Sequence, residues 1–140
     1  MIELGHGTAT SVSTPDAFFK KRVDHDTWPE WSPDTEWVEL HGPLRLGTRG
    51  VLKPKGGPKT KFFINALVEN QKYTDTSILP GARLVFEHVA VQKNSLTELW
   101  VSVTVKGPLA WLWAVILGNG FKDTAQSDLD RLVRVVESGQ

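Results

Sequence analysis

Residues 98–108 read ELWVSVTVKGP, and they contain the clearest strand pattern in the chain together with the signal that ends it. Along this run four apolar residues share one face: Leu99, Val101, Val103 and Val105. The opposite face carries Trp100 among polar residues. A period of two is typical of a strand in a sheet with one covered face. The Gly107-Pro108 pair then ends the strand.

The element that covers this face follows directly in the sequence. Beyond Gly107-Pro108, apolar residues recur at helical spacing: Phe121, Ala125, Leu129, Leu132 and Val136. This spacing predicts one long helix over roughly 107–137 that packs on the sheet. Within it, Gly118-Asn119-Gly120 predicts a kink or short break, because each glycine costs about 1 kcal/mol relative to alanine in a helix interior.

The chain before residue 98 predicts an antiparallel meander. Glycine, proline and asparagine turn signals separate runs of β-branched and aromatic residues. These runs, with the one already quoted, place strands near 36–41, 48–53, 60–69, 72–78, 83–91 and 96–105. Most of the connections are short enough for tight turns, so neighbouring strands are expected to run antiparallel.

An earlier strand is expected from Glu3 to Val12, because this stretch is rich in Thr and Ser with scattered apolar residues. Thr14-Pro15-Asp16 then predicts a helix start, since it offers a hydroxyl cap, a proline in the first turn and an acid at the positive end of the helix dipole. That helix is expected to end near Val23. Trp28-Pro29-Glu30-Trp31 predicts a short helical elbow after it.

Length and composition are those of a single globular domain over residues 1–140. Sixteen basic residues balance sixteen acidic ones, which argues against a nucleic-acid partner. The absence of cysteine excludes disulfides, thiolate metal sites and cysteine nucleophiles. Neither the opening residues nor the apolar run from Pro108 to Gly118 predicts a signal peptide or a transmembrane segment. A cytoplasmic location is expected.

Six local motifs occur in a characteristic order: Ser13-Thr14-Pro15, Trp28-Pro29-Glu30-Trp31, Gly47-Thr48-Arg49-Gly50, Leu79-Pro80-Gly81-Ala82-Arg83, Phe86-Glu87-His88 and Gly107-Pro108-Leu109. With the element order, they resemble the START/polyketide-cyclase-like superfamily (SRPBCC or helix-grip proteins) over nearly the whole chain. Within it, the bacterial polyketide cyclase/dehydrase and lipid-transport group is most similar. The resemblance implies an α+β helix-grip fold: a curved antiparallel sheet of six to seven strands wrapped around a long C-terminal helix, with a hydrophobic cavity between them.

Three functions are compatible with this resemblance, because the superfamily includes carriers, receptors and enzymes. The leading hypothesis is that the protein binds a small hydrophobic molecule, such as a lipid or a polyketide-like compound. A carrier would also transport this molecule. The first alternative is a cyclase- or dehydratase-type enzyme with His88 as acid/base. The second is a non-catalytic dimeric interaction module whose own side chains fill the cavity. No cofactor is expected for any of them.

Strand alternation and the helix crossing predict which residues line the cavity. The predicted ligand-binding set is Trp31, Phe62, Phe86, His88, Leu99, Val101, Leu112 and Ile116. His88 shares its strand face with Leu84, Phe86 and Ala90, so it is expected to be the main ionisable group of the cavity. Apolar surroundings should lower its pKa below 6.5 and keep it neutral at pH 7. The alternative is that His88 has a purely structural role and is held by a neighbouring backbone or side-chain group.

The tryptophans near the start of the long helix raise a separate question. Trp111 and Trp113 lie about 200° apart around a helix, so one should face inward and the other outward. Which of the two faces the cavity is left open. The run from Leu109 to Leu117 predicts an apolar patch for a second copy in a homodimer, for a membrane surface or for a cavity entrance, or else a buried turn under neighbouring loops.

Two polar motifs are expected to be solvated rather than functional. Asp24-His25-Asp26 has side chains that can bind metals, but three consecutive residues do not converge on one ion, and no metal site is predicted. Lys53 to Lys59 is basic and glycine-rich, yet it lacks the pattern of a phosphate-binding loop and is expected to be a hairpin turn.

Overall fold

A computed structural model describes residues 1–139 of the chain. Seven strands form one sheet: β1 (Ile2–Ser11), β2 (Thr35–Leu40), β3 (Arg49–Pro54), β4 (Thr60–Val68), β5 (Lys72–Leu79), β6 (Ala82–Lys93) and β7 (Leu96–Lys106). Three helical elements accompany them: α1 (Pro15–Arg22), the 3₁₀ helix η1 (His25–Glu30) and α2 (Ala110–Glu137). Every predicted strand and helix is present, with ends that differ by three residues or fewer.

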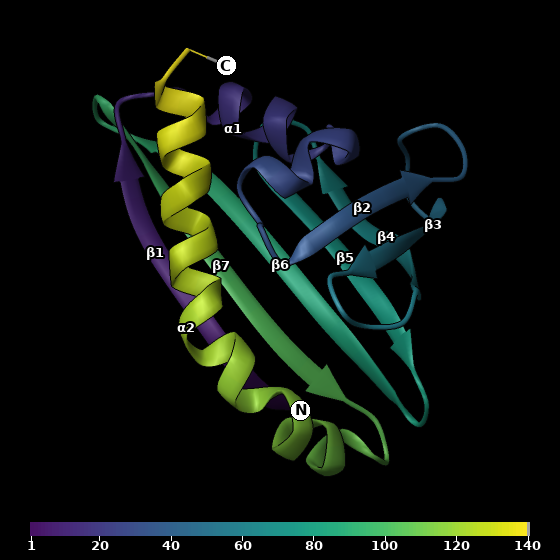
Figure 1. Cartoon of the computed structure of the whole chain (residues 1–140). Helices are drawn as coiled ribbons and strands as arrows, with labels where there is room; N and C mark the ends of the chain where they lie inside the picture. Colours follow the sequence, from purple (N-terminus) through teal and green to yellow (C-terminus); the bar gives the residue numbers. More distant parts are fainter. Residues whose placement is uncertain (140) are drawn as a thin grey trace.

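The sheet is fully antiparallel, in the order β1-β7-β6-β5-β4-β3-β2. The meander from β2 to β7 is closed at one edge by β1, which returns from the N-terminus to pair with β7. Figure 1 shows the sheet curving, with α2 lying across its concave face and α1 and η1 at one end. This is the predicted helix-grip architecture.

The register of β7 confirms which face of the sheet is covered. Its four alternating apolar side chains, from Leu99 to Val105, are between 0% and 5% exposed. Trp100, on the other face, is 42% exposed. The apolar face of the central strands therefore meets α2, as the alternation predicted.

The C-terminal half of α2 is the part of the helix that packs on the sheet. Its buried residues are the predicted ones: Ala125, Leu129, Leu132 and Val136. β1 comes so close to this helix that a side chain at Gly5 would overlap the Phe121 carbonyl. A glycine is therefore required where the strand and the helix cross.

The N-terminal half of α2 differs from its prediction at its start and bends where a kink or break was predicted. The helix begins at Ala110 rather than at 107, because Gly107 has a φ of +114° that a helix does not accept. It then continues through Gly118-Asn119-Gly120 without a break, and Figure 1 shows it changing direction in this region, so of the predicted kink or short break the structure has the kink. The Thr124 hydroxyl donates to the Gly120 carbonyl at 2.7 Å, a backbone contact that commonly accompanies helix bending.

The helix α1 starts where predicted, but the hydrogen bond at its N-terminus differs from the predicted hydroxyl cap. Thr14 is the N-cap residue, and its side chain makes no capping hydrogen bond. Its carbonyl instead accepts from the Ala17 amide at 3.1 Å, and Pro15 and Asp16 occupy the first turn. No helix in the described residues is long and apolar enough to cross a membrane.

Candidate functional site

A cavity of about 190 Å³ lies between the concave face of the sheet, η1 and α2. Apolar side chains from the sheet and α2 form most of its wall: Leu52, Phe62, Phe86, Val101, Val103 and Leu129. Phe86 on β6 meets Phe121 on α2 edge to face, with ring centroids 5.6 Å apart, and both rings line the cavity. The inner face of the sheet thus supplies an apolar wall that α2 closes.

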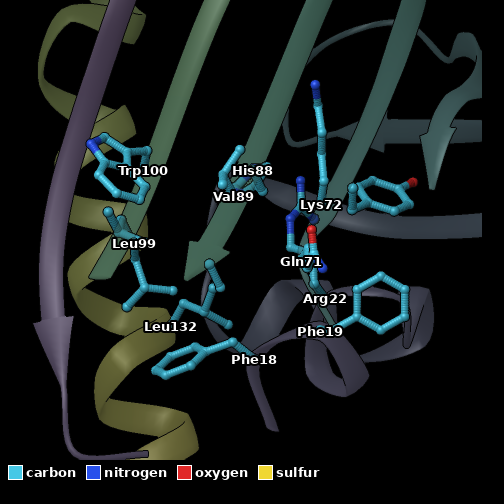
Figure 2. Close-up of a pocket in the computed structure, with 13 residues that line it drawn as sticks. Phe18, Phe19, Arg22, Gln71, Lys72, His88, Val89, Leu99, Trp100 and Leu132 are labelled. Atoms are coloured by element: carbon cyan, nitrogen blue, oxygen red, sulfur yellow. The ribbon is translucent and has the colours of Figure 1, made fainter. Parts of the chain in front are cut away.

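A second, much smaller cavity of about 30 Å³ lies beside the first, where α1 meets the sheet. Figure 2 shows its lining residues converging from α1, β6, β7 and α2, among them Phe18, His88, Leu99 and Leu132. Its volume is enough for roughly one or two water molecules. Arg22 and His88 line both cavities and so lie between them.

Arg22 is held among aromatic rings at the end of α1. The Arg22 Cζ lies 4.5 Å from the ring centroid of Trp28, 4.8 Å from that of Trp31 and 4.9 Å from that of Tyr73. Its carbonyl accepts a hydrogen bond from Trp28 Nε1 at 2.9 Å. Arg22 is only 4% exposed, and burial is the main cause that lowers its pKa. The rings compensate part of the cost of burying the guanidinium through cation–π contacts.

Asp75, from β5, places a second buried charge near Arg22. The Tyr73 hydroxyl donates to Asp75 Oδ2 at 3.0 Å, and His25 Nε2 lies 2.8 Å from the same hydroxyl. Because that hydroxyl donates to Asp75, His25 is the donor in the second bond. Burial raises the pKa of Asp75 to about 6, while Arg22 and the Tyr73 bond oppose this rise. Burial also raises the pKa of Tyr73 above its ordinary range.

His25 contradicts the prediction that Asp24-His25-Asp26 is a solvated helix end. Asp24 and Asp26 are exposed, but His25 is 5% exposed and stacks on Trp28 with ring centroids 4.8 Å apart. Burial, and then the charge of Arg22, lower its pKa to about 4. The 3₁₀ turn points this one side chain inward. No group of three or more metal-binding side chains occurs within residues 1–139.

His88 projects from β6 toward the cavity, where its ring meets the Trp31 ring edge-on at a centroid distance of 6.1 Å. Burial, and then the charge of Arg22, hold the pKa of His88 well below 6.5. In the described part of the chain no hydrogen bond joins its ring to another residue. A neutral imidazole therefore faces the cavity with one donor and one acceptor nitrogen.

Asp128 supplies a third acid, from α2. It accepts from the Ser32 hydroxyl at 2.9 Å and from Arg131 Nη1 at 3.3 Å. Burial raises its pKa, and these two partners oppose the rise. With Asp34 also on the rim, four ionisable residues besides His88 line the cavity: Arg22, Asp34, Asp75 and Asp128. The prediction that His88 is the main ionisable group is therefore wrong.

Five of the eight predicted cavity residues line the larger cavity: Trp31, Phe62, Phe86, His88 and Val101. Leu99 faces the correct side of the sheet but lines the smaller cavity, because β7 runs past the end of the larger one toward α1. Leu112 and Ile116 lie outside both cavities and are 37% and 58% exposed. They belong to the first turns of α2, before the helix bends onto the sheet.

The two tryptophans of α2 also lie away from the larger cavity. Trp111 is 61% exposed. Trp113 is partly buried, and its Nε1 donates to the Pro80 carbonyl at 2.8 Å. Trp113 thus fixes α2 to the turn between β5 and β6, and Trp111 faces outward with Val115 and Ile116.

Arg22 and Asp75 carry only weak signals in the sequence. Arg22 follows Phe18 by four residues, so both share the buried face of α1, but a charge in that position usually indicates a solvated face. Asp75 alternates with Tyr73 and Ser77, yet the other face of β5 carries Thr74 and Thr76, so both faces read as polar. The burial of both faces of β5 in the structure is what shows that Asp75 is an interior residue.

No family model matches the sequence, and no curated protein matches it. Solved structures do share its fold. A protein from Thermus thermophilus, TTHA0849, superposes with a TM-score of 0.74 at 12% identity, covering 97% of this chain and 98% of that one. Ara h 8.0201 superposes with a TM-score of 0.67 at 19% identity, covering 96% of this chain and 97% of that one. The Zhui aromatase/cyclase from Streptomyces sp. R1128 superposes with a TM-score of 0.66 at 12% identity, covering 94% of this chain and 92% of that one. The chain therefore has the helix-grip fold of the START/polyketide-cyclase-like proteins.

Proposed function

We infer that the protein binds a small hydrophobic molecule in the cavity between the sheet and α2. The observation that carries this inference is the apolar wall around a volume of about 190 Å³. An apolar protein cavity of about 150 Å³ accepts benzene. The volume thus suits a molecule of one or two rings, or a short chain, without a change in conformation. A shared fold with an aromatase/cyclase is compatible with a ring-shaped ligand.

Apolar contact alone gives such a ligand modest affinity. Burying about 150 Å² of an aromatic ring gains about 4 kcal/mol. Before the cost of association is subtracted, this corresponds to a dissociation constant of about 1 mM. Tighter binding requires polar contacts, which the cavity offers at Arg22, Trp31 and His88. A cytoplasmic location, and transport of the ligand in a carrier role, belong to the same proposal.

A cyclase- or dehydratase-type enzyme is the second candidate, and the position of His88 favours it. The imidazole is neutral, faces the cavity and makes no hydrogen bond within residues 1–139. Both ring nitrogens are therefore open to a bound molecule, as an acid/base group requires, although the lowered pKa makes this imidazole a weaker base than a free histidine. The two candidates differ in one observable: a binding protein releases its ligand unchanged, whereas an enzyme releases a product of different mass or structure.

A homodimer through Leu109 to Leu117 stays a prediction. The side chains of this segment form an apolar patch, with Trp111, Val115 and Ile116 each more than half exposed. Such a patch is compatible with a partner surface. The volume of the cavity argues against the version of this hypothesis in which the protein's own side chains fill it.

Native mass spectrometry of the purified protein tests the binding function. Val103 is 2% exposed and lines the cavity, whereas its neighbour Ser102 lies on the opposite face of β7. Val103→Phe should fill part of the cavity, and Ser102→Phe adds the same ring on the outer face. We expect a mass adduct on the parent protein and on Ser102→Phe that is lost from Val103→Phe.

Both variants should first show cooperative thermal unfolding, so that loss of the adduct reports the cavity. An adduct retained by folded Val103→Phe would place the ligand elsewhere and contradict the proposal. If the parent protein carries no adduct and binds no aromatic probe when soaked with one, the binding function fails.

A further inference from the structure

Two residues in the wall of the larger cavity, Arg22 and Trp31, carry buried hydrogen-bond donors without a protein acceptor in the described part of the chain. Among residues 1–139, three nitrogen atoms at one end of it are buried and unpaired: Arg22 Nε, Arg22 Nη1 and Trp31 Nε1. None of them carries a lone pair, so each can only donate. Most buried polar groups in proteins are paired, because an unpaired buried donor is destabilising, and a charged one more so.

The neighbouring acids do not supply the missing acceptor. None of the ion pairs within the described residues includes Arg22. Asp75 accepts from Tyr73, and Asp128 accepts from Ser32 and Arg131. Both acids act on Arg22 through the electrostatic field rather than by direct contact. The guanidinium is therefore charged, buried and, within the described residues, without a protein acceptor at the wall of the cavity.

The aromatic rings hold these donors in place. The Arg22 guanidinium lies against the Trp28, Trp31 and Tyr73 rings, at 4.5–4.9 Å from their centroids. Trp28 is in turn fixed by its bond to the Arg22 carbonyl. A donor group that is already positioned loses little conformational freedom when it binds an acceptor. The rest of the wall is apolar, so the cavity is polar at the Arg22 end and apolar along the sheet.

We propose that the ligand is a small apolar molecule carrying one oxygen acceptor, a carbonyl or a carboxylate, which accepts hydrogen bonds from Arg22 and Trp31. This proposal rests on the binding function inferred above and specifies the class of ligand. The carbon skeleton lies against Phe62, Phe86 and Val101. The acceptor oxygen lies at the Arg22 end, where it pairs donors that the protein leaves unpaired.

Three naphthalene probes of similar shape test the proposal. 2-Acetonaphthone carries a neutral carbonyl, 2-naphthoate carries a carboxylate, and 2-isopropenylnaphthalene has no oxygen. Dissociation constants are measured by two-dimensional NMR titration for the parent protein, for Arg22→Met and for Lys20→Met, a control that removes an exposed charge from the same helix.

We expect the parent protein and Lys20→Met to bind at least one oxygen-bearing probe about tenfold more tightly than 2-isopropenylnaphthalene. In Arg22→Met this preference should fall below about twofold, because the affinity for the oxygen-bearing probe falls while that for 2-isopropenylnaphthalene is kept. Tighter binding of 2-naphthoate identifies an anionic acceptor, and tighter binding of 2-acetonaphthone a neutral one.

Trp31→Phe provides a second test that leaves Arg22 in place and keeps an aromatic ring at position 31. It removes the donor nitrogen together with two ring carbons, and it should reduce the preference by less than Arg22→Met does. Equal binding of all three probes by the parent protein would overturn the acceptor proposal while leaving the binding function intact. A preference that persists in folded Arg22→Met would overturn it too. If no probe binds, the binding function fails and this proposal with it.

Discussion

Burial changes the acid–base behaviour of the side chains around the cavity. The pKa of His88 is lowered and that of Asp75 is raised, because burial disfavours the charged form of each. Arg22 strengthens the first shift and opposes the second, as its positive charge disfavours an imidazolium and favours a carboxylate. One buried cation therefore influences both the acid and the base that face the cavity.

His88 is expected to stay neutral throughout the physiological range. The imidazole Hε1 resonance of His88, assigned by its absence from His88→Leu, should not titrate between pH 6 and 8. His88→Leu should keep the fold and alter the preference among bound molecules, since leucine provides neither donor nor acceptor. An imidazole that titrates near or above pH 6.5 and does not respond to a ligand would remove His88 from the site.

Asp75 is expected to make stability decrease as the pH rises through the weakly acidic range. Its folded-state pKa of about 6 lies above the usual 3.8, so the native state holds the proton more tightly than the unfolded chain does. The stabilisation from this protonation is fully present below pH 3.8 and is lost as the pH rises through about 6. The free energy of unfolding of the parent protein, relative to Asp75→Asn, should therefore fall by roughly 3 kcal/mol between about pH 3.8 and pH 7.

Urea unfolding of both proteins across that range provides the measurement. The difference between the two proteins isolates Asp75 from His25 and His88, whose lowered pKa values act in the opposite direction over the same pH range. Parallel curves for the two proteins would show that Asp75 titrates normally in the native state.

The helix α2 has two halves with different surroundings. Beyond the bend it packs on β1 and β7 through Ala125, Leu129 and Leu132, as its helical spacing predicted. Before the bend, the equally apolar residues Val115 and Ile116 are exposed. Sequence periodicity identifies the apolar face of a helix, but it does not show where the sheet beneath that face ends. For this reason the prediction that Leu112 and Ile116 line the cavity is wrong.

Two alanine substitutions on this helix should have very different effects on stability. Leu132 is 2% exposed, and Leu132→Ala should lower the free energy of unfolding by about 2–5 kcal/mol through lost burial and a new cavity. Ile116 is 58% exposed, and Ile116→Ala should change it by no more than about 0.5 kcal/mol. Chemical denaturation measures both. A large loss for Ile116→Ala would mean that this segment is covered in solution, as in the predicted homodimer.

At the scale of the whole molecule, the fold is far easier to predict than the site. Strand alternation, turn residues and helical spacing are local signals, and they place the seven strands and the covering helix correctly. The polar part of the cavity depends on residues that are distant in the chain, namely Arg22 on α1, Asp75 on β5 and Asp128 on α2. Each of these residues is compatible with the local sequence pattern of its helix or strand, so the pattern does not mark it as a cavity residue. The packing of α1 and α2 against the curved sheet brings them together, and no single segment encodes that arrangement.

The central claim is that the ligand is held between the sheet and α2, and intermolecular nuclear Overhauser effects test it most directly. The protein is labelled at its methyl groups and mixed with 2-acetonaphthone. We predict contacts from the naphthyl protons to the methyl groups of Val101, Val103 and Leu129, which line the cavity. Contacts confined to Leu112, Val115 and Ile116, on the exposed face of α2, would contradict the claim.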